Sequence, residues 1–235
     1  MDQLYMIFDK FLKDFYTVVV ENNRWQMYLT GLGNTICIAL VAVFIGTMIG
    51  LIVAIIKYYA VNNKKLWLLD KLCDLYITVI RGTPTLIQIL IMYTVILSSV
   101  KNGVPVAMLA FGINSGAYVA EIIRAGILSV DKGQSEAGRS LGLNSNMTMT
   151  LIILPQAVKN ILPALFNEFI VLLKETSVAG YIAVQELTKS ADLIRGRTFI
   201  GLPLFISAGL YLIMVVGMTA LQKRLERRLA KGDNR

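Results

Sequence analysis

Histidine is absent from this 235-residue chain, and cysteine, proline and charge are scarce. Without histidine, the most common general base and a common zinc ligand are both missing. The two cysteines, Cys37 and Cys73, lie in or beside apolar runs, so neither a disulfide nor a metal site is expected. The sequence also lacks a G-x-x-x-x-G-K-[S/T] phosphate loop and any pairing of a nucleophile with a base. The chain is therefore expected to be non-catalytic and to bind no cofactor or metal itself.

Long apolar runs are abundant, and they place the chain in a membrane. Hydrophobic residues make up 56% of the sequence and charged residues only 16%. Four uncharged stretches approach the roughly 20 residues that a helix needs to cross the hydrocarbon, and they cover 35–56, 82–100, 102–120 and 198–222. A fifth stretch, 160–184, is apolar apart from Glu168, Lys174 and Glu175. We therefore predict an all-α integral membrane protein with five transmembrane helices, at about 30–57, 82–100, 104–128, 160–184 and 198–222.

The uncharged stretch 140–158 is not counted as a span. Polar residues crowd its first half, and Pro155 interrupts its second half. The charges in the loops set the orientation, because Lys and Arg gather on the cytoplasmic side. Residues 57–71 hold four lysines against one aspartate, and residues 223–235 hold six basic residues against two acidic ones. We expect residues 1–24 to form an amphipathic extracytoplasmic segment, 25–225 the transmembrane domain, and 226–235 a cytoplasmic tail.

That topology places residues 129–159 in the cytosol. It also accounts for the net charge of +8 as a consequence of membrane orientation, so no nucleic acid partner is expected. The remaining partner that composition alone predicts is the lipid bilayer.

Small residues recur every four positions in the first span, at Ala42, Gly46, Gly50 and Ala54. Such a stripe lets another helix approach closely, and we expect it to serve assembly with a second membrane subunit. A similar stripe in the third span comprises Gly112, Gly116 and Ala120, and Asn114, Tyr118 and Glu121 lie on the roughly opposite face. These three polar residues either line a pathway or form interhelical hydrogen bonds.

The segment Arg81-Gly82-Thr83-Pro84 ends an amphipathic helix and redirects the chain into the second span. We favour a kink that turns an interfacial helix into the membrane, although a broken helix can also line a cavity.

Charges inside the fourth span are the strongest functional signal from physics alone, because an ionisable group in a membrane costs roughly 3 kcal/mol or more unless it is paired or solvated. Glu168 and Glu175 are seven residues apart and share a helical face, which favours a cationic solute. The alternative is a set of internal salt bridges, Glu168 with Arg124 or Glu121 with Lys174. Arg124 is also a ready partner for Glu121 at i+3.

The cytosolic segment resembles the EAA signature of membrane subunits of ATP-binding-cassette (ABC) importers. The matching residues are Glu136, Ala137, Gly138, Gly142, Ile152, Leu154 and Pro155. Gly138 stands where the pattern has its second alanine, a change expected to leave a close-packed contact intact. Further segments resemble the polar amino acid branch of this family, including RGTP at Arg81, AYVAEIIRAG from 117, KETS at Lys174 and QELT from 185.

The resemblance implies a type I importer permease with its N-terminus outside and its C-terminus cytoplasmic, in a bacterial cytoplasmic membrane. It would pair with itself or with a sister permease, and receive substrate from an extracytoplasmic amino-acid-binding protein. The EAA helices would dock into a cytosolic ATPase dimer, which binds ATP and Mg. Ala137, Gly138 and Gly142 would permit close backbone contact, while Glu136 and Arg139 would make polar contacts.

The resemblance also implies a substrate class. Members that carry basic amino acids often have an S-N-E-like triplet after an L-P-A turn, and here Leu162-Pro163-Ala164 precedes Phe166-Asn167-Glu168. We expect Glu168 to meet the cationic side chain of arginine, lysine or histidine, with Asn114, Tyr118, Glu121 and Asn167 nearby. Arg81, Pro84, Lys174, Glu175 and Thr176 are assigned to structure and gating. The alternatives are another polar amino acid such as glutamine or cystine, or a cation-coupled transporter or channel that works without ATP.

Overall fold

The structure is a computed structural model that describes residues 2–61 and 63–230. Every regular element in these two ranges is helical. The α-helices are α1 (Asp2–Phe15), α2 (Trp25–Ala60), α3 (Trp67–Gly82), α4 (Thr85–Ile91), α5 (Gly103–Leu128), α6 (Lys132–Ser140), α7 (Ser145–Thr148), α8 (Leu154–Glu175), α9 (Leu187–Thr198) and α10 (Leu202–Ala230). Short 3-10 or π segments are η1 (Tyr16–Val20), η2 (Glu21–Asn23), η3 (Lys64–Leu66), η4 (Met92–Ile96), η5 (Met149–Ile153) and η6 (Thr176–Ile182).

Four helical stretches in the described residues are long and apolar enough to cross a membrane. They are Trp25–Ala60, Gly103–Leu128, Ser145–Ile182 and Leu202–Leu229. The helices Lys64–Gly82 and Thr85–Ile96 meet at a bend of 108°, and they add a fifth span if the two together form one broken span. The predicted all-α membrane fold is confirmed, with four or five spans.

The second and fourth spans differ in detail from what the sequence predicted. The span expected over 82–100 is instead the 12-residue stretch Thr85–Ile96, which follows the sharp corner at Gly82–Pro84. At 1.5 Å per residue such a helix is about 18 Å long, too short to cross the hydrocarbon alone. The helix of the fourth span begins at Ser145 rather than near 160, because α7, the π segment η5 and α8 follow one another without a break. The π segment ends just before Leu154 and Pro155, and the missing N–H of this proline would interrupt a regular α-helix.

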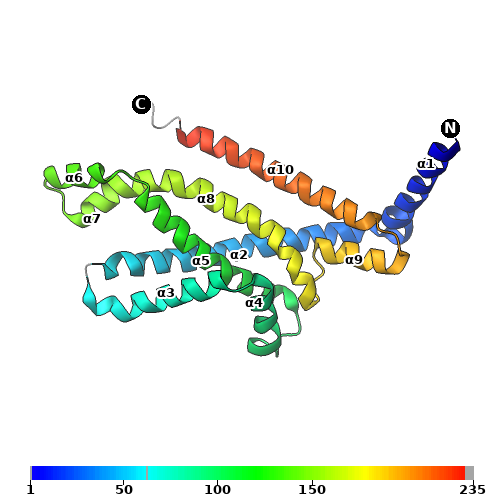
Figure 1. Cartoon of the computed structure of the whole chain (residues 1–235), viewed down its shortest axis with the longest axis horizontal. Coiled ribbons are helices and arrows are strands. Elements are labelled where there is room, and N and C mark those ends of the chain that lie inside the picture. The colour runs from blue at the N-terminus through cyan, green and yellow to red at the C-terminus, as the bar shows by residue number, and fades with distance from the viewer. Residues whose placement is uncertain (1, 62, 231–235) are drawn as a thin grey trace.

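Helices α2 and α5 form the centre of the protein (Figure 1). Glycines set how closely these two helices approach. A Cβ added to Gly46 would lie 2.8 Å from the Ser115 side chain, and one added to Gly50 would lie 2.5 Å from Val119. The close contact is reciprocal, because Gly112 of α5 lies against Ile45 of α2. The stripe expected to join a second subunit is therefore used inside the chain. Periodicity predicted the close approach, but it could not identify the partner helix.

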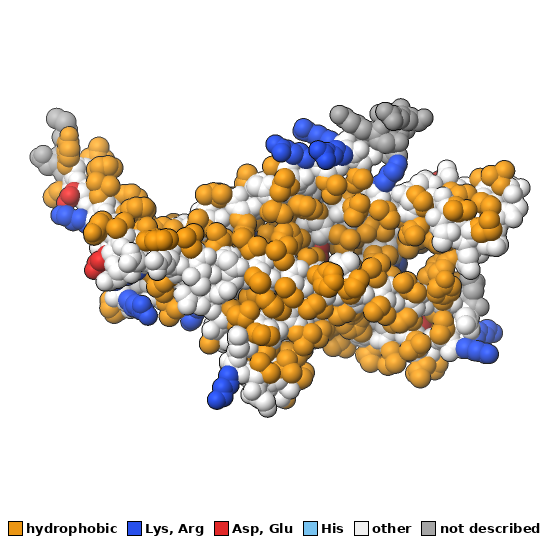
Figure 2. Space-filling model, turned by 180° about the vertical axis from the view of Figure 1, so that it is seen from behind, with side chains coloured by type: hydrophobic (Ala, Val, Ile, Leu, Met, Phe, Trp, Pro, Cys, Tyr) orange, Lys and Arg blue, Asp and Glu red, His pale blue; other side chains and the backbone are white. Residues whose placement is uncertain are grey.

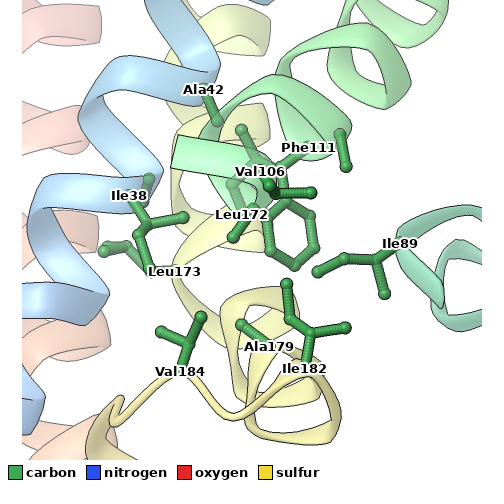
Figure 3. Packing of buried hydrophobic residues seen from close by; sticks show 13 residues of the cluster. Ile38, Ala42, Ile89, Val106, Phe111, Leu172, Leu173, Ala179, Ile182 and Val184 are labelled. Carbon is green, nitrogen blue, oxygen red and sulfur yellow. The ribbon is translucent and has the colours of Figure 1, made fainter. Parts of the chain in front are cut away.

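The largest apolar cluster lies where α2, α5 and α8 meet the short helix α4 (Figure 3). Phe111 of α5 is fully buried and lies among Leu172 of α8, Ile89 of α4 and Ile182 of η6. Because these side chains come from four different elements, burying them fixes the position of α4 against the central helices.

Apolar side chains also cover much of the outer surface (Figure 2). In α10, which lies along one edge of the protein (Figure 1), only 6% of the most apolar 18-residue window is buried. Phe205, Ile213 and Val216 of this helix are exposed by 77%, 70% and 59%. An apolar surface of this extent fits a protein surrounded by lipid, where exposed leucine or phenylalanine carries no cost.

Candidate coupling segment and translocation site

Helices α6 and α7 form a hairpin at one end of the protein, opposite the end that carries α1 (Figure 1). Asp131 caps α6 by accepting a hydrogen bond from the Gly133 amide at 2.7 Å, and Asn144 caps α7 by accepting from the Met147 amide at 2.9 Å. The turn between them uses Gly142 at a φ of 81°, a left-handed conformation that favours glycine. The polar segment predicted from the sequence is therefore a capped helical hairpin.

The EAA residues divide between the surface and the interior of this hairpin. Glu136, Ala137 and Arg139 are exposed on α6, and Gly142, Leu154 and Pro155 are exposed beyond it. Gly138 alone is buried, and it faces the chain's own Thr148: a Cβ at Gly138 would lie 2.8 Å from Thr148 Cγ2 and 3.0 Å from Ile152 Cδ1. The alanine of the usual pattern would not fit here without a shift of these neighbours. Gly138 thus shapes the hairpin and does not lie on its surface.

Glu168 lies on α8 with 9% of its surface exposed, facing α5. The Ser115 hydroxyl donates to Glu168 Oε1 at 2.9 Å, and no described residue donates to Oε2. Ser115 in turn packs on Gly46, so the α2–α5 contact positions the donor. The internal pairing of Glu168 with Arg124, considered from the sequence, does not occur, because Arg124 is occupied elsewhere.

Glu121 forms ion pairs with two arginines, Arg124 and Arg81. The Arg124 guanidinium donates to both carboxylate oxygens of Glu121, at 3.0 and 2.8 Å, and Arg81 lies 3.4 Å from Oε2. The Arg81 guanidinium also lies over the Tyr118 ring, 5.4 Å from its centroid. Glu121 therefore has the partner at i+3 that the sequence allowed, and it does not pair with Lys174.

Gln88 of α4 ties the corner between α3 and α4 to α5. Its side-chain amide donates to the Ile80 carbonyl at 2.8 Å and to Thr83 Oγ1 at 2.8 Å, and its Oε1 accepts from the Asn114 amide at 2.9 Å. Asn114 is 2% exposed and Gln88 is half-buried, so this hydrogen bond is partly shielded from solvent. Asn114, Tyr118 and Glu121 share one face of α5, and each contacts a residue of the corner.

The other predicted residues lie along the same elements. Asn167 and Lys174 are exposed on α8, and Glu175 is half-buried. Thr176 is fully buried and donates to the Leu173 carbonyl at 2.8 Å. Pro84 is the N-cap residue of α4, directly after the bend. Glu168 thus contacts one side of α5, at Ser115. Arg81 of α3 and Gln88 of α4 contact a different side of α5.

Glu186 is a buried carboxylate that the sequence analysis did not single out. It caps α9 by accepting from the Thr188 and Lys189 amides at 2.7 and 2.5 Å, and it accepts from the Tyr211 hydroxyl at 3.0 Å. Burial raises the pKa of this carboxyl above its usual value, although these donors oppose the shift. An acidic residue just before the start of a helix was the available signal. Gln88 and Ser115 offered none, because a lone polar residue in an apolar helix does not reveal its partner.

The chain is similar to known membrane components of transport systems. Residues 46–231 match the family described as binding-protein-dependent transport system inner membrane component. The chain is 39% identical over 199 residues to a protein named as a glutamine transport system permease of Rickettsia felis, covering 83% of this chain and 89% of the relative. It is 36% identical over 209 residues to the arginine transport system permease ArtQ of Bacillus subtilis, covering 87% and 93%.

A solved structure of an amino acid ABC transporter with histidines also resembles this chain. One of its chains is 42% identical and superposes with a TM-score of 0.80, covering 86% of this chain and 94% of that one. The family match includes the C-terminal part of α2, residues 46–60, and all of the α6–α7 hairpin and α8, including Glu168. This chain belongs to the family of inner membrane components of binding-protein-dependent transport systems.

Proposed function

We propose that this chain is the permease subunit of an ATP-driven importer of a polar amino acid, and that the amino acid is a basic one, arginine, lysine or histidine. The observation that carries the proposal is the Glu168 carboxylate. It lies within the candidate membrane span Ser145–Ile182 and is 9% exposed, with Oε1 held by Ser115 and Oε2 accepting from no described residue. A carboxylate held in this way can accept a hydrogen bond from a cationic side chain.

The relatives support an amino acid and leave its identity open, because one is named for glutamine and another for arginine, and the solved amino acid transporter was crystallised with histidines. Glutamine has no charge to pair with a carboxylate, whereas a basic side chain does. A charge-assisted contact contributes about 1.5 to 3 kcal/mol, which corresponds to about 10- to 150-fold in affinity. Glu168 is therefore the residue expected to discriminate basic from neutral amino acids, and Asn114, Tyr118, Glu121 and Asn167 complete the proposed pathway.

The test is uptake by the assembled transporter carrying Glu168→Gln. We expect the preference for arginine and lysine over glutamine to fall about 10-fold or more, together with the ATPase activity stimulated by basic substrates. The matched control is Ser115→Ala, which removes the hydrogen bond to Oε1 but keeps the carboxylate, and should retain the preference. Unchanged uptake and ATPase stimulation in Glu168→Gln would contradict the assignment. Wild-type uptake that excess arginine and lysine do not displace would point to glutamine, cystine or another polar amino acid.

The hairpin of α6 and α7, residues 132–148, is the proposed contact for a cytosolic ATPase dimer, which binds ATP and Mg, and it is called the coupling hairpin below. Exposed Glu136 and Arg139 lie beside Ala137 on α6, so charged groups surround a small residue that permits close approach. We expect Arg139→Glu to reduce copurification of the ATPase, whereas Lys65→Glu, at an exposed lysine of the α2–α3 turn, should not. Equal recovery of the ATPase with both variants would count against this docking surface.

Assembly completes the proposal. The permease acts in a bacterial cytoplasmic membrane, with a second copy or a sister subunit, and an extracytoplasmic binding protein delivers the substrate. A transporter or channel that works without ATP is the remote alternative. Transport by the reconstituted chain in the absence of any ATPase would favour it.

A further inference from the structure

Helix α1 precedes the region that matches the family, which begins at residue 46. It extends from the end of the protein that is opposite the coupling hairpin (Figure 1). Its role therefore does not follow from the family match, and it must be argued from its own residues.

One face of α1 is apolar and exposed. Tyr5, Ile7 and Phe8 are exposed by 74%, 66% and 61%. Leu4, Phe11, Leu12 and Phe15 lie on the same side of the helix, because spacings of three, four and seven residues share a face. The opposite side carries the ion pair between Asp9 and Lys13, with a distance of 2.7 Å. An aromatic stripe of this size would be costly in water.

The junction between α1 and α2 is fixed, so the direction of α1 is built into the fold. Asn22 and Asn23 have left-handed φ values of 55° and 54° and break the helix there. Val18 is fully buried against Leu187, Ala191 and Ile194 of α9, and Arg24 donates to the Thr17 carbonyl. The chain before this corner is held as an arm, and its apolar face extends beyond the packed core.

The apolar face of α1 continues into the lipid-exposed surface of the first span. Phe15 and Tyr16 are exposed by 42% and 59%, and Trp25 and Leu29 at the start of α2 by 44% and 57%. Figure 2 shows apolar side chains running along the arm and onto the main body. At 1.5 Å per residue, the 14 residues of α1 reach about 21 Å, which is too short to cross a bilayer but suits its interface.

We infer that α1 is an interfacial helix that lies in the head-group region of the membrane leaflet opposite the coupling hairpin, with its aromatic face toward the acyl chains. Aromatic side chains are favoured at this depth. The helix carries three aspartates and two lysines, so it is not attracted by negative lipids. Binding depends on apolar burial, and uncharged phosphatidylcholine is a sufficient partner.

Tryptophan fluorescence in vesicles tests this placement. The background is the full chain with Trp25→Phe and Trp67→Phe, which removes both native tryptophans. Phe8→Trp then reports on the aromatic face, and Met6→Trp, two residues away on the polar side, is the matched control. Each variant is reconstituted in phosphatidylcholine vesicles with or without bromine on the upper acyl chain. We expect bromine to quench Phe8→Trp at least about twofold more strongly than Met6→Trp.

The other outcomes contradict the inference. Absent quenching of Phe8→Trp with a blue-shifted emission would mean that protein covers the face, either a second copy or a binding protein. Absent quenching with a red emission would mean that the helix stands in water. Equal strong quenching of both variants would mean that α1 lies wholly within the hydrocarbon. Addition of anionic lipid should leave the difference between the variants unchanged, and a difference that appears only with anionic lipid would overturn the apolar mechanism.

Discussion

Replacing Gly138 by alanine should weaken the coupling hairpin. The new Cβ would lie 2.8 Å from Thr148 Cγ2 and 3.0 Å from both Thr148 Oγ1 and Ile152 Cδ1, closer than carbon atoms pack. Overpacking of this kind costs about 1 to 3 kcal/mol, and alanine recovers about 1 kcal/mol of helix propensity relative to glycine. We therefore expect a net loss of about 1 kcal/mol in the free energy that keeps the hairpin closed.

Hydrogen exchange can measure this local free energy. The amides of Leu141 and Leu143 donate to the carbonyls of Ala137 and Gly138 at 3.1 Å each, and they become free when α6 opens. A loss of about 1 kcal/mol would raise their exchange rates about fivefold. In the assembled transporter, we expect substrate-stimulated ATPase activity to fall as well, since a loosened hairpin transmits less motion.

Thr148→Ser provides the decisive comparison, because it removes the methyl group that the new Cβ meets. Gly138→Ala should cost less in the Thr148→Ser background, with a coupling energy of about 1 kcal/mol between the two changes. Ala137→Gly is the control: it weakens the same helix by about 1 kcal/mol through propensity alone, and should be insensitive to Thr148→Ser. If Gly138→Ala costs the same in both backgrounds, the steric explanation is refuted.

Three further predictions concern the packing of the membrane domain and its polar contacts. Gly50→Ala should lower the Tm because its Cβ would lie 2.5 Å from Val119, whereas Gly33→Ala, with open space around it, should not. Glu186 should make the free energy of unfolding fall as pH rises. Burial raises the pKa of this carboxyl, so the folded state favours its protonated form. The free energy of unfolding should therefore fall from about pH 4.3, the usual pKa of glutamate, upward through the pKa of the folded state. The Tm of Glu186→Gln should therefore depend less on pH over that window, and an unchanged pH dependence would contradict this. Gln88→Leu should reduce uptake by leaving the buried Asn114 amide unpaired, a cost of about 1 to 3 kcal/mol, while Gln88→Glu, which keeps the acceptor, should retain more activity.

Sequence patterns predicted the helices well because each depends on local chemistry. The uncharged runs marked the spans, and Gly82 with Pro84 marked the corner that the structure bends by 108°. Partners were harder to predict. The stripe at Gly46 and Gly50 signalled that some helix comes close, but the same signal would arise for a neighbour in another subunit. Similarly, the small residue at Gly138 signalled a close contact, and the contacting atom belongs to this chain rather than to an ATPase.

The polar face of α5 shows why the candidate pathway could not be resolved from spacing alone. Asn114, Tyr118 and Glu121 share a face, and that pattern fits both a pathway and a set of interhelical contacts. In the structure the corner between α3 and α4 contacts all three, through Gln88 and Arg81. On the proposed function, we expect a substrate that binds to this face to displace contacts that hold the corner in place.

Glu168 differs from these residues in the contacts it already makes. Ser115 occupies one carboxylate oxygen, so a basic substrate could reach the other oxygen without breaking an internal ion pair. On the proposed function, we expect recognition at Glu168 to leave the ion pairs of Glu121 intact, whereas recognition along the Asn114 face would disturb the contacts of Gln88 and Arg81. If both contribute, substitutions at Glu168 should change which amino acid is preferred, and substitutions at Gln88 should change the transport rate of every substrate alike.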